Sequence, residues 1–366
     1  MATAKKLPSG SWRVQVYAGK DAHGKRQYRS FTALTKKEAE YAALQWQLHY
    51  KEVSRDATAM TFQEAAEKYI RSKDGVLSPA TIRGYDIILR NHLQSLMPLR
   101  LDRITPALVQ EAINEESKPY EDAKGRKHTP TPKSVRNIHG FLSAVLRMYR
   151  PSLQLDTTLP QKQRTEQRYL EPEEIAVLLK AIQGTEMEIP VLLAVWLSLR
   201  SSEVTGLTWS CVDFGRSTIT VRQAQVRDKS NQWVEKSTKT TSSTRTISAP
   251  AYIMDLLREK KAQEGGGPED HVVAIKGNGL YQRLKTILRK NGLPDIRFHD
   301  LRHTNASVMA LLNVPDIYAQ QRGGWATPGV MKKVYQHTMT AKQNAVNETI
   351  DKYFYSLLGE DTVEAV

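Results

Sequence analysis

The chain opens with side chains that alternate between apolar and polar. Over Trp12–Tyr17 the alternation has a period of two, which is typical of a β-strand with one buried face. Residues 25–31 are expected to pair with this strand after a glycine-containing turn. A helix is then expected from Thr35 to about residue 51. We therefore predict that residues 1–55 form a small three-stranded sheet plus a helix.

Residues 60–150 follow the spacing of amphipathic helices. Thr61 and Glu64 form a capping box, in which each side chain accepts a hydrogen bond from the other residue's backbone N–H. Ser78-Pro79 starts a second helix, because proline is favoured in the first helical turn. The expected elements that follow are a helix near 106–114, a polar loop over 117–130 and a helix over 133–149. The pattern predicts an all-α domain.

The sequence pattern of residues 151–366 predicts a linker, a mixed domain and a tail. Residues 151–168 are polar and contain proline, as linkers do. Residues 169–345 combine a helix from Glu171-Pro172, a strand pair near 217–248 and further helices, so we expect a mixed α/β domain. The tail, residues 346–366, has an apolar stripe at helical spacing, made of Val346, Ile350, Phe354 and Leu357. This stripe either packs on its own domain or docks on a neighbouring protomer. The fold class is multidomain α+β.

The net charge of the chain indicates a polyanionic partner. The 366 residues carry a formal net charge of +14, and nucleic acid is the commonest partner of so basic a chain. Residues 1–37 hold nine Lys and Arg against a single acid, Asp21. The N-terminal sheet is therefore either a solvated basic surface or a surface that contacts DNA. The candidate DNA-contact residues are Arg13, Lys25, Arg26, Arg29, Arg83 and Arg90.

Cysteine usage and hydropathy exclude several classes of protein. The single cysteine, Cys211, excludes an internal disulfide and a cysteine-based zinc site. The N-terminus has no apolar run of signal-peptide length, and the longest apolar stretch, Pro190–Leu197, is too short to span a bilayer. We therefore expect a cytoplasmic protein with no membrane partner.

Two segments carry cationic side chains suited to chemistry on a phosphate. Arg200 follows an apolar run, at the expected end of a buried helix, and Glu203 stands three residues later to hold the arginine or a neighbouring helix. Lys239 is expected at or near the turn of a β-hairpin. Taken singly, the first is an ordinary ion pair and the second an ordinary turn lysine.

Two later segments add histidine, arginine and aromatic side chains. His299 and Arg302 are three residues apart, so they share a helix face. Trp325 precedes Tyr335 by ten residues. His299 and His303 also have the spacing of a zinc-binding His-Glu-x-x-His helix, although Asp rather than Glu follows His299 and Arg302 would stand beside the metal. A zinc hydrolase therefore remains an alternative.

The ordered set resembles the motif of the tyrosine site-specific recombinases, the family of phage and conjugative-transposon integrases. Its members are Arg200, Lys239, His299, Arg302, Trp325 and Tyr335. The resemblance covers residues 169–345 closely, as the catalytic domain. Residues 60–150 are similar, more loosely, to the core-binding domain, and the basic N-terminal hairpin to the arm-site-binding domain of many integrases.

The resemblance implies a role for each of these side chains. Tyr335 is the nucleophile that forms a 3′-phosphotyrosyl link, and Arg200 and Arg302 clamp the non-bridging phosphate oxygens. The supporting roles are a hydrogen bond from Trp325, proton acceptance by His299, proton donation to the leaving 5′-oxygen by Lys239, and support by Glu203. No metal, ATP or other cofactor is implied.

The implied partners are double-stranded DNA, at core and arm attachment sites, and three further copies of the chain. In the family, four protomers exchange strands through a Holliday junction, and an excision factor or a host DNA-bending protein is a further partner class. The basic N-terminal unit favours an integrase of a phage or integrative mobile element, acting in the cytoplasm of a bacterial host, over a chromosome-dimer resolvase.

Two departures from the family pattern keep an alternative open. Trp325 stands where many relatives have histidine, so a general-acid role is excluded at that position. Arg200 lacks the usual preceding Thr-Gly, although Glu203, Leu207, Trp209 and Asp213 match what normally follows. The alternative is a non-catalytic DNA-binding regulator with the same fold, which would have no need of a tyrosine at that spacing.

Overall fold

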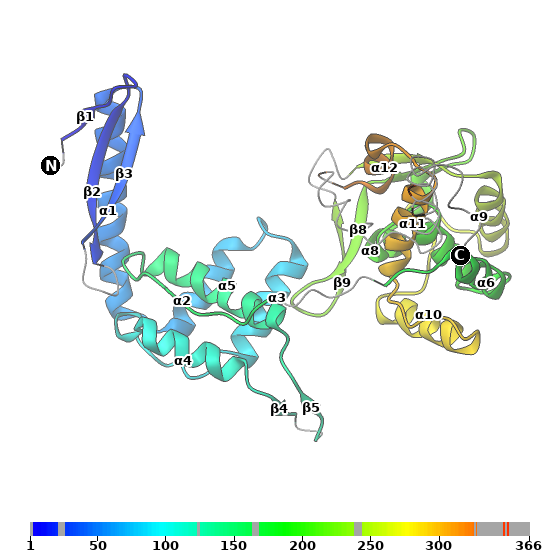
Figure 1. The fold of residues 1–366 in the computed structure, drawn as a ribbon, viewed down its shortest axis with the longest axis horizontal. Helices are drawn as coiled ribbons and strands as arrows, with labels where there is room; N and C mark the ends of the chain where they lie inside the picture. Colours follow the sequence, from blue (N-terminus) through cyan, green and yellow to red (C-terminus); the bar gives the residue numbers. More distant parts are fainter. Residues whose placement is uncertain are drawn as a thin grey trace, which may run out of the picture. The chain divides into compact units, whose positions relative to one another are not determined.

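A computed structural model describes residues 3–20, 26–122, 125–162, 168–237, 244–325, 327, 347 and 350. The chain divides into two compact units (Figure 1). The first consists of Met1–Arg164 with Arg227–Gln232, and the second of Thr165–Val226 with Trp233–Val366. The predicted linker over 151–168 contains the boundary.

The first unit begins with an antiparallel sheet packed on a long helix. The strands are β1 (Lys5–Lys6), β2 (Trp12–Lys20) and β3 (Arg26–Ala33), in the order β1-β2-β3, and the helix is α1 (Lys36–Ala59). Val14 and Val16 are buried in one cluster with Ala39 and Ala43 of α1, as the alternation predicts. The helix runs past its predicted end near residue 51, because no glycine or proline interrupts the sequence before Met60.

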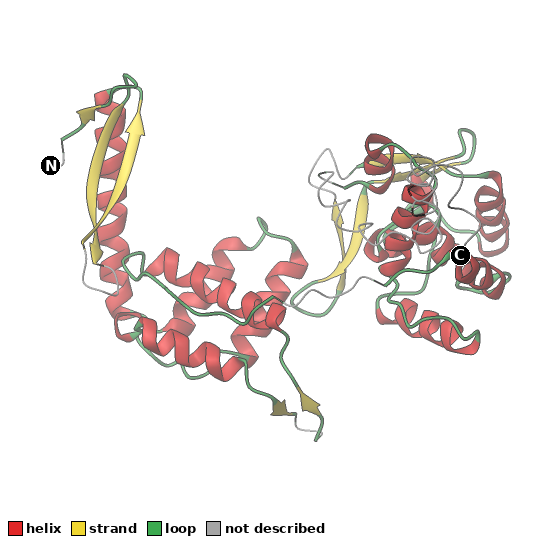
Figure 2. Cartoon of the chain, viewed as in Figure 1, coloured by secondary structure: helices red, strands yellow, loops and turns green. Residues whose placement is uncertain are grey.

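The rest of the described part of the first unit is mainly helical. Its helices are α2 (Phe62–Lys73), α3 (Pro79–Asn91), α4 (Pro106–Glu116) and α5 (Pro132–Tyr149), with a 3-10 turn at Leu101–Arg103 (Figure 2). A Ser or Thr side chain caps each helix at its N-terminus, and the predicted capping box at Thr61 is confirmed. The expected loop over 117–130 holds a short ribbon of β4 (Tyr120–Glu121) and β5 (Lys127–His128).

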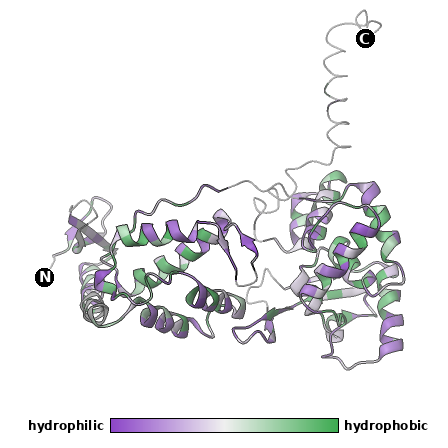
Figure 3. Cartoon of the chain, turned by 90° about the horizontal axis from the view of Figure 1, so that it is seen from below, coloured by the Kyte–Doolittle hydropathy of each residue, from purple (hydrophilic) through white to green (hydrophobic). Residues whose placement is uncertain are grey.

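The second unit mixes helices with short strands. Its helices are α6 (Pro172–Ile182), α7 (Glu188–Val195), α8 (Ser201–Thr205), α9 (Ala251–Glu264), α10 (Asn278–Lys290), α11 (Asp300–Leu311) and α12 (Asp316–Gly323), with a 3-10 turn at Trp209–Cys211. Its strands are β6 (Val212–Asp213), β7 (Thr218–Val221), β8 (Gln223–Arg227), β9 (Trp233–Ser237) and β10 (Arg245–Ser248). Apolar residues of α7 belong to its core, and hydrophobic and hydrophilic residues alternate along the helices of both units (Figure 3).

The structure corrects two sequence-based expectations near the predicted site. Lys239 was expected in the turn of a hairpin, but the strands on either side of it belong to different sheets. β9 pairs with β8, whereas β10 pairs with β7, so that Ile247 lies opposite Ile219 in the core. The chain around Arg200 also differs, because α7 already ends at Val195. Ser198 has a φ of 61°, in the left-handed region, and Arg200 is the N-cap of α8.

No helix in the described part of the chain is long and apolar enough to cross a membrane.

Candidate active site

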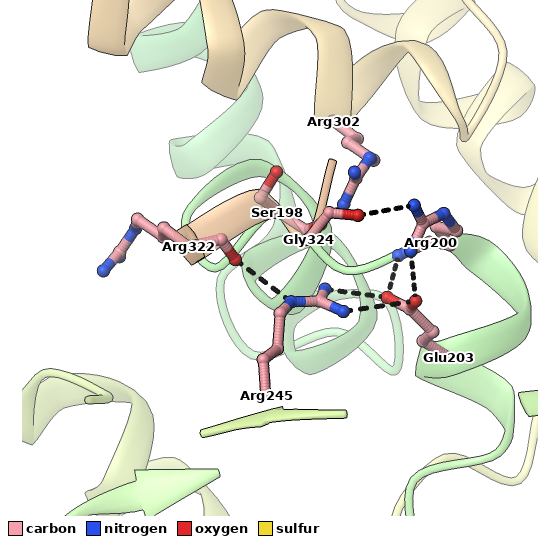
Figure 4. Close-up of polar contacts among 7 residues, drawn as sticks. All are labelled: Ser198, Arg200, Glu203, Arg245, Arg302, Arg322 and Gly324. Atoms are coloured by element: carbon pink, nitrogen blue, oxygen red, sulfur yellow. Dashed lines mark hydrogen bonds and ion pairs between the residues drawn. The ribbon is translucent and has the colours of Figure 1, made fainter. Parts of the chain in front are cut away.

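Glu203 is the centre of a polar cluster in the second unit. Its carboxylate accepts a hydrogen bond from Arg200 Nη1 at 2.6 Å and from Arg245 Nη2 at 2.8 Å, while Arg245 Nη1 lies 3.3 Å from its other oxygen. Figure 4 shows the carboxylate between the two guanidinium groups. Burial opposes ionisation of Glu203, but the hydrogen bonds and charges of Arg245 and Arg200 outweigh it and lower its pKa to about 2. Glu203 is therefore an anion at neutral pH.

The two arginines also hold the end of α12. Arg200 Nη2 donates to the carbonyl of Gly324 at 3.0 Å, and Arg245 Nε donates to the carbonyl of Arg322 at 3.1 Å (Figure 4). Cationic donors suit these carbonyls, because the last carbonyls of a helix lack intrahelical partners and carry partial negative charge. Segments far apart in the sequence therefore meet at Glu203.

Arg302 lies in the core without a carboxylate partner among the described residues. Its side chain is 1% exposed, and Nη1 donates to the carbonyl of Ser198. The guanidinium carbon lies 4.4 Å from the centroid of the Trp325 ring, in cation–π contact. Nη2 is buried and has no hydrogen-bond partner within the described ranges. Burial, together with the nearby charge of Arg200, lowers the pKa of Arg302 to about 9.

Trp325 is held by the two glycines that precede it. A Cβ on Gly323 would overlap the indole ring, so only glycine leaves room for the buried ring at that position. Gly324 has a φ of 62° and ends α12 in the left-handed conformation, which turns the chain toward Trp325. The pair Gly323-Gly324 therefore places the indole face against Arg302.

His299 stands at the N-terminus of α11, one turn from Arg302. Its ring meets the ring of His303 edge to face at 4.8 Å. Burial and the charge of Arg302 lower the pKa of His299, and burial with the neighbouring imidazole lowers that of His303 to about 4. Both rings are therefore neutral at pH 7. Among the described residues, no third histidine, cysteine or carboxylate joins them in a group that could hold a metal ion.

The cluster has more positive than negative charge. The guanidinium groups of Arg200 and Arg245 contact the carboxylate of Glu203, and that of Arg302 lies near enough to feel its charge. Three cations against one anion leave two positive charges uncompensated within the described part of the cluster. Arg200 is 36% exposed, so its guanidinium remains open to a ligand. An anion with several oxygens, such as a phosphate, fits this arrangement, because forked guanidinium groups bind it through paired hydrogen bonds.

Comparison with known proteins identifies the family. Residues 168–342 match the phage integrase family, and residues 61–117 match the phage integrase N-terminal SAM-like domain. A tyrosine recombinase XerC-like protein of Caldanaerobacter subterraneus subsp. tengcongensis is 24% identical over 94% of this chain and 96% of its own. The integrase of Mycobacterium phage L5 is 26% identical over 81% of this chain and 80% of its own. The chain belongs to the tyrosine site-specific recombinases.

Solved structures share the fold of this recombinase. The Tn1549 transposon integrase, in complex with transposon right end DNA, superposes with a TM-score of 0.63 and 19% identity, over 80% of this chain and all of the other. A lambda integrase tetramer bound to a Holliday junction has a TM-score of 0.54 and 16% identity, over 91% of this chain and 94% of that one. The chain is thus an integrase-type enzyme, and the alternative of a non-catalytic regulator is not favoured.

The described residues bring together four of the predicted site residues of the recombinase. Arg200, Glu203, Arg302 and Trp325 lie in one cluster, and His299 lies one turn from Arg302. Lys239 and Tyr335, the predicted proton donor and nucleophile, lie outside the described residues. Three of the four tail residues, Val346, Phe354 and Leu357, also lie outside them, whereas Ile350 is described as helical and exposed.

Arg245 is the residue of this cluster that the sequence analysis missed. Arg245 stands two residues before the buried Ile247 on strand β10, and side chains two residues apart on a strand lie on the same face. Its side chain therefore points inward. An arginine at an inward position of a strand signals a buried ionic partner, because an unpaired buried charge is costly. The sequence contained that signal, but it did not show that Glu203 would be the partner of Arg245.

The candidate DNA-contact residues of the first unit differ in their surroundings. Arg13 pairs with Thr32 across the sheet, on the face turned away from the buried Val14 and Val16. The guanidinium of Arg29 lies over the rings of Phe31 and Trp46, at 5.8 and 5.7 Å. Arg90 pairs with Asp86 at 2.8 Å, and Arg26 is exposed. Arg83 is half-buried and donates to the side-chain oxygen of Asn231 at 3.3 Å, and Lys25 lies outside the described residues.

Proposed function

We propose that this recombinase cuts and rejoins double-stranded DNA through Tyr335, with the scissile phosphate bound by Arg200 and Arg302. One observation carries this proposal: a buried arginine, Arg302, has a guanidinium nitrogen without a partner in the described cluster, beside a second, half-exposed arginine. Burying such a charge opposes folding, so a site that keeps it has a use for an anion.

The chemistry follows from the charge that develops at phosphorus. The Tyr335 oxygen forms a bond to phosphorus as the bond from phosphorus to the 5′-oxygen breaks, and the product is a 3′-phosphotyrosyl link and a free 5′-hydroxyl. Arg200 and Arg302 stabilise the non-bridging oxygens, where negative charge increases. His299 is neutral at pH 7 and accepts the phenol proton, while Lys239 gives a proton to the 5′-oxygen.

The role of Trp325 in this proposal is twofold. Its indole N–H donates to the phosphate, and its ring face holds Arg302 by the cation–π contact described above. Tryptophan does not exchange a proton, so the proton transfers are left to His299 and Lys239. Glu203 supports Arg200 and does not touch the phosphate.

Rejoining reverses the first step with a different DNA strand. A 5′-hydroxyl from the partner duplex attacks the phosphotyrosyl bond, so the bond energy is conserved without ATP. We propose that a homotetramer performs two such exchanges through a Holliday junction, which integrates and excises a phage or other mobile element. An excision factor or a host DNA-bending protein would set the direction. The similarity to the lambda integrase tetramer supports this assembly.

A suicide substrate tests the nucleophile. The wild-type protein, incubated with a nicked attachment site, should be trapped on the DNA as a denaturation-resistant adduct. Tyr335→Phe removes the attacking oxygen and should give no adduct, measured by denaturing gel. Tyr318→Phe, at an exposed tyrosine of α12, is the matched control and should react like the wild type.

An adduct that persists in Tyr335→Phe would overturn the assignment and point to another tyrosine, such as Tyr353 or Tyr355. DNA cleavage that EDTA abolishes and that leaves no covalent adduct would favour the zinc alternative instead.

We further propose a division of labour among the domains. Residues 1–55 bind arm sites, residues 60–150 bind the core site, residues 169–345 perform the chemistry and residues 346–366 dock on a neighbouring protomer. Lys5 and Arg13 pair across the sheet, and Tyr17 meets Tyr28 edge to face at 5.9 Å on the same outer side. Exposed cations beside exposed aromatic rings are suited to contact with DNA.

Charge removal on this outer face tests the arm-binding role. The double variant Lys5→Gln, Arg13→Gln should weaken binding to arm-site DNA and lower the slope of log affinity against log salt by about 2, because each phosphate contact releases about one counterion. Cleavage at a core site should be unchanged. The control, Lys36→Gln with Lys37→Gln at the start of α1, removes the same charge elsewhere. Equal weakening by the two double variants would refute a specific role for the sheet.

A further inference from the structure

The contacts of Arg245 differ from those of the other two arginines of the cluster. Arg245 is 7% exposed on its side chain, and its three nitrogens all donate: two to Glu203 and one to the carbonyl of Arg322. Arg200 is half-buried, and Arg302 keeps an unpartnered nitrogen in the described cluster. Each guanidinium nitrogen of Arg245 therefore has a protein acceptor, and the side chain is buried within the cluster.

We propose that Arg245 is a positioning residue of the recombination site, which fixes Glu203 and the end of α12 so that Arg200 and Trp325 meet the phosphate correctly. The inference rests on the proposed function, since it concerns the geometry of that phosphate site. It assigns Arg245 no contact with DNA.

Arg245 acts on Arg200 through the shared carboxylate. Arg245 contacts both oxygens of Glu203, which fixes the plane of the carboxylate. Glu203 then accepts from the backbone N–H of Arg200 at 2.9 Å and from its Nη1 at 2.6 Å. The position of the Arg200 side chain therefore depends on the orientation that Arg245 gives to Glu203.

Arg245 acts on Trp325 through the last residues of α12. Its Nε holds the carbonyl of Arg322, and a Cβ on Gly324 would lie 3.0 Å from its Nη1. The arginine thus packs against the backbone that leads into Trp325, whose ring contacts Arg302. A shift of this backbone would move the indole and, with it, the guanidinium of Arg302.

A lysine cannot replace these contacts. Its ammonium is a point charge on a flexible stem, whereas the guanidinium is a rigid fork that binds both carboxylate oxygens and, through Nε, a third acceptor. Arg245 is also the first residue of β10, where it pairs with Val221 of β7, and it stands six residues after Lys239 in the sequence. The strand fixes the Cα of Arg245, so the fork determines where its partners lie.

The test separates the rate of chemistry from DNA affinity and from the amount of folded protein. Arg245→Lys and Arg245→Met would be compared with wild type in single-turnover adduct formation on a suicide substrate, with DNA affinity measured on an intact core site. Arg283→Met is the matched control, because Arg283 is an exposed arginine that pairs with a carboxylate, Glu186, outside the cluster.

We expect the adduct rate constant to fall about 100-fold in Arg245→Met and about 10-fold in Arg245→Lys, since small displacements of reacting groups cost about two orders of magnitude. The dissociation constant for the core site should stay within about threefold of wild type, because Arg245 does not touch DNA. The final adduct yield should also be retained, which separates a slower reaction from a loss of folded protein. Arg283→Met should match wild type in every measurement.

Three outcomes would overturn the inference. A wild-type rate constant in Arg245→Lys would mean that charge alone suffices and the fork has no role; this holds even if the methionine variant does not fold. A loss of DNA affinity in proportion to the rate would make Arg245 a DNA contact. A loss of yield with an unchanged rate constant would make its role purely structural. Absence of an adduct in the wild type, by contrast, would overturn the proposed function itself.

Discussion

Replacement of Arg302 by methionine is expected to lower the rate of covalent adduct formation by about 10³-fold while changing the free energy of unfolding by no more than about 1 kcal/mol. Arg302 is 1% exposed, and among the described residues it has a carbonyl and an indole face as neighbours but no carboxylate. Its guanidinium therefore costs desolvation free energy that the carbonyl and the indole face recover only in part and that a bound anion would recover further. Methionine fills the same space without that cost.

The two effects are measured by single-turnover cleavage of a suicide substrate and by urea unfolding. Some stability is lost because the carbonyl of Ser198 loses its donor, and some is regained because a buried charge is removed. The surface variant Arg283→Met should leave both quantities unchanged. An Arg302→Met protein that cleaves within tenfold of the wild-type rate would remove this arginine from the phosphate site.

Replacement of Glu203 by glutamine is expected to destabilise the protein by about 3 kcal/mol at pH 7. The buried carboxylate compensates Arg245, and its removal leaves that arginine without a counter-charge in the described cluster. The fall of the Glu203 pKa from 4.5 to about 2 corresponds to about 3 kcal/mol in favour of the folded state. Adduct formation should slow as well, because Arg200 loses the acceptor that orients it.

The pH dependence of stability gives an independent check on Glu203. The pKa of this carboxyl is lower in the folded chain than in the unfolded chain, so its contribution is fully present above about pH 4.5 and is lost as the pH falls through 2. The difference in unfolding free energy between wild type and Glu203→Gln should therefore shrink by about 2 kcal/mol from pH 7 to pH 3. The groups that act on Glu203 are Arg200, Arg245 and Arg302.

Glu186→Gln is the control for this titration, because Glu186 is an exposed carboxylate that pairs with Arg283. Its difference from wild type should be small and should change little over the same pH range. If the Glu203→Gln difference were independent of pH, the carboxylate would not be the ionised centre of the cluster.

The helices of residues 60–150 were predictable because their signals are local. Thr61 and Ser78 each precede a helix that starts at the next residue, as predicted, and their side chains cap it. Thr105 and Thr131 cap the two later helices in the same way. The long helix α1 was underestimated in length for a related reason: a helix without a glycine or proline has no local stop signal. Residues near a helix start therefore predicted where these helices begin, whereas nothing in the local sequence predicted where α1 ends.

Strand pairing near Lys239 was not predictable in the same way. β9 and β10 are neighbours in the sequence, and a hairpin between them was the natural expectation. Instead, β10 pairs with β7 because this register buries Ile247 against the core of the second unit. Partner choice in a sheet depends on which strands share a core, and a local sequence pattern does not contain that information.

The sequence by itself determined the order of the chemistry-bearing residues, the family and the caps of the helices, since each of these depends on residue type and spacing along the chain. Only the tertiary structure decided that Glu203 faces both Arg200 and Arg245, that Arg302 is buried against Trp325, and that Gly323 leaves room for the indole. The physical reason is that burial and charge compensation depend on segments 42 to 124 residues apart in the chain, which only folding brings together.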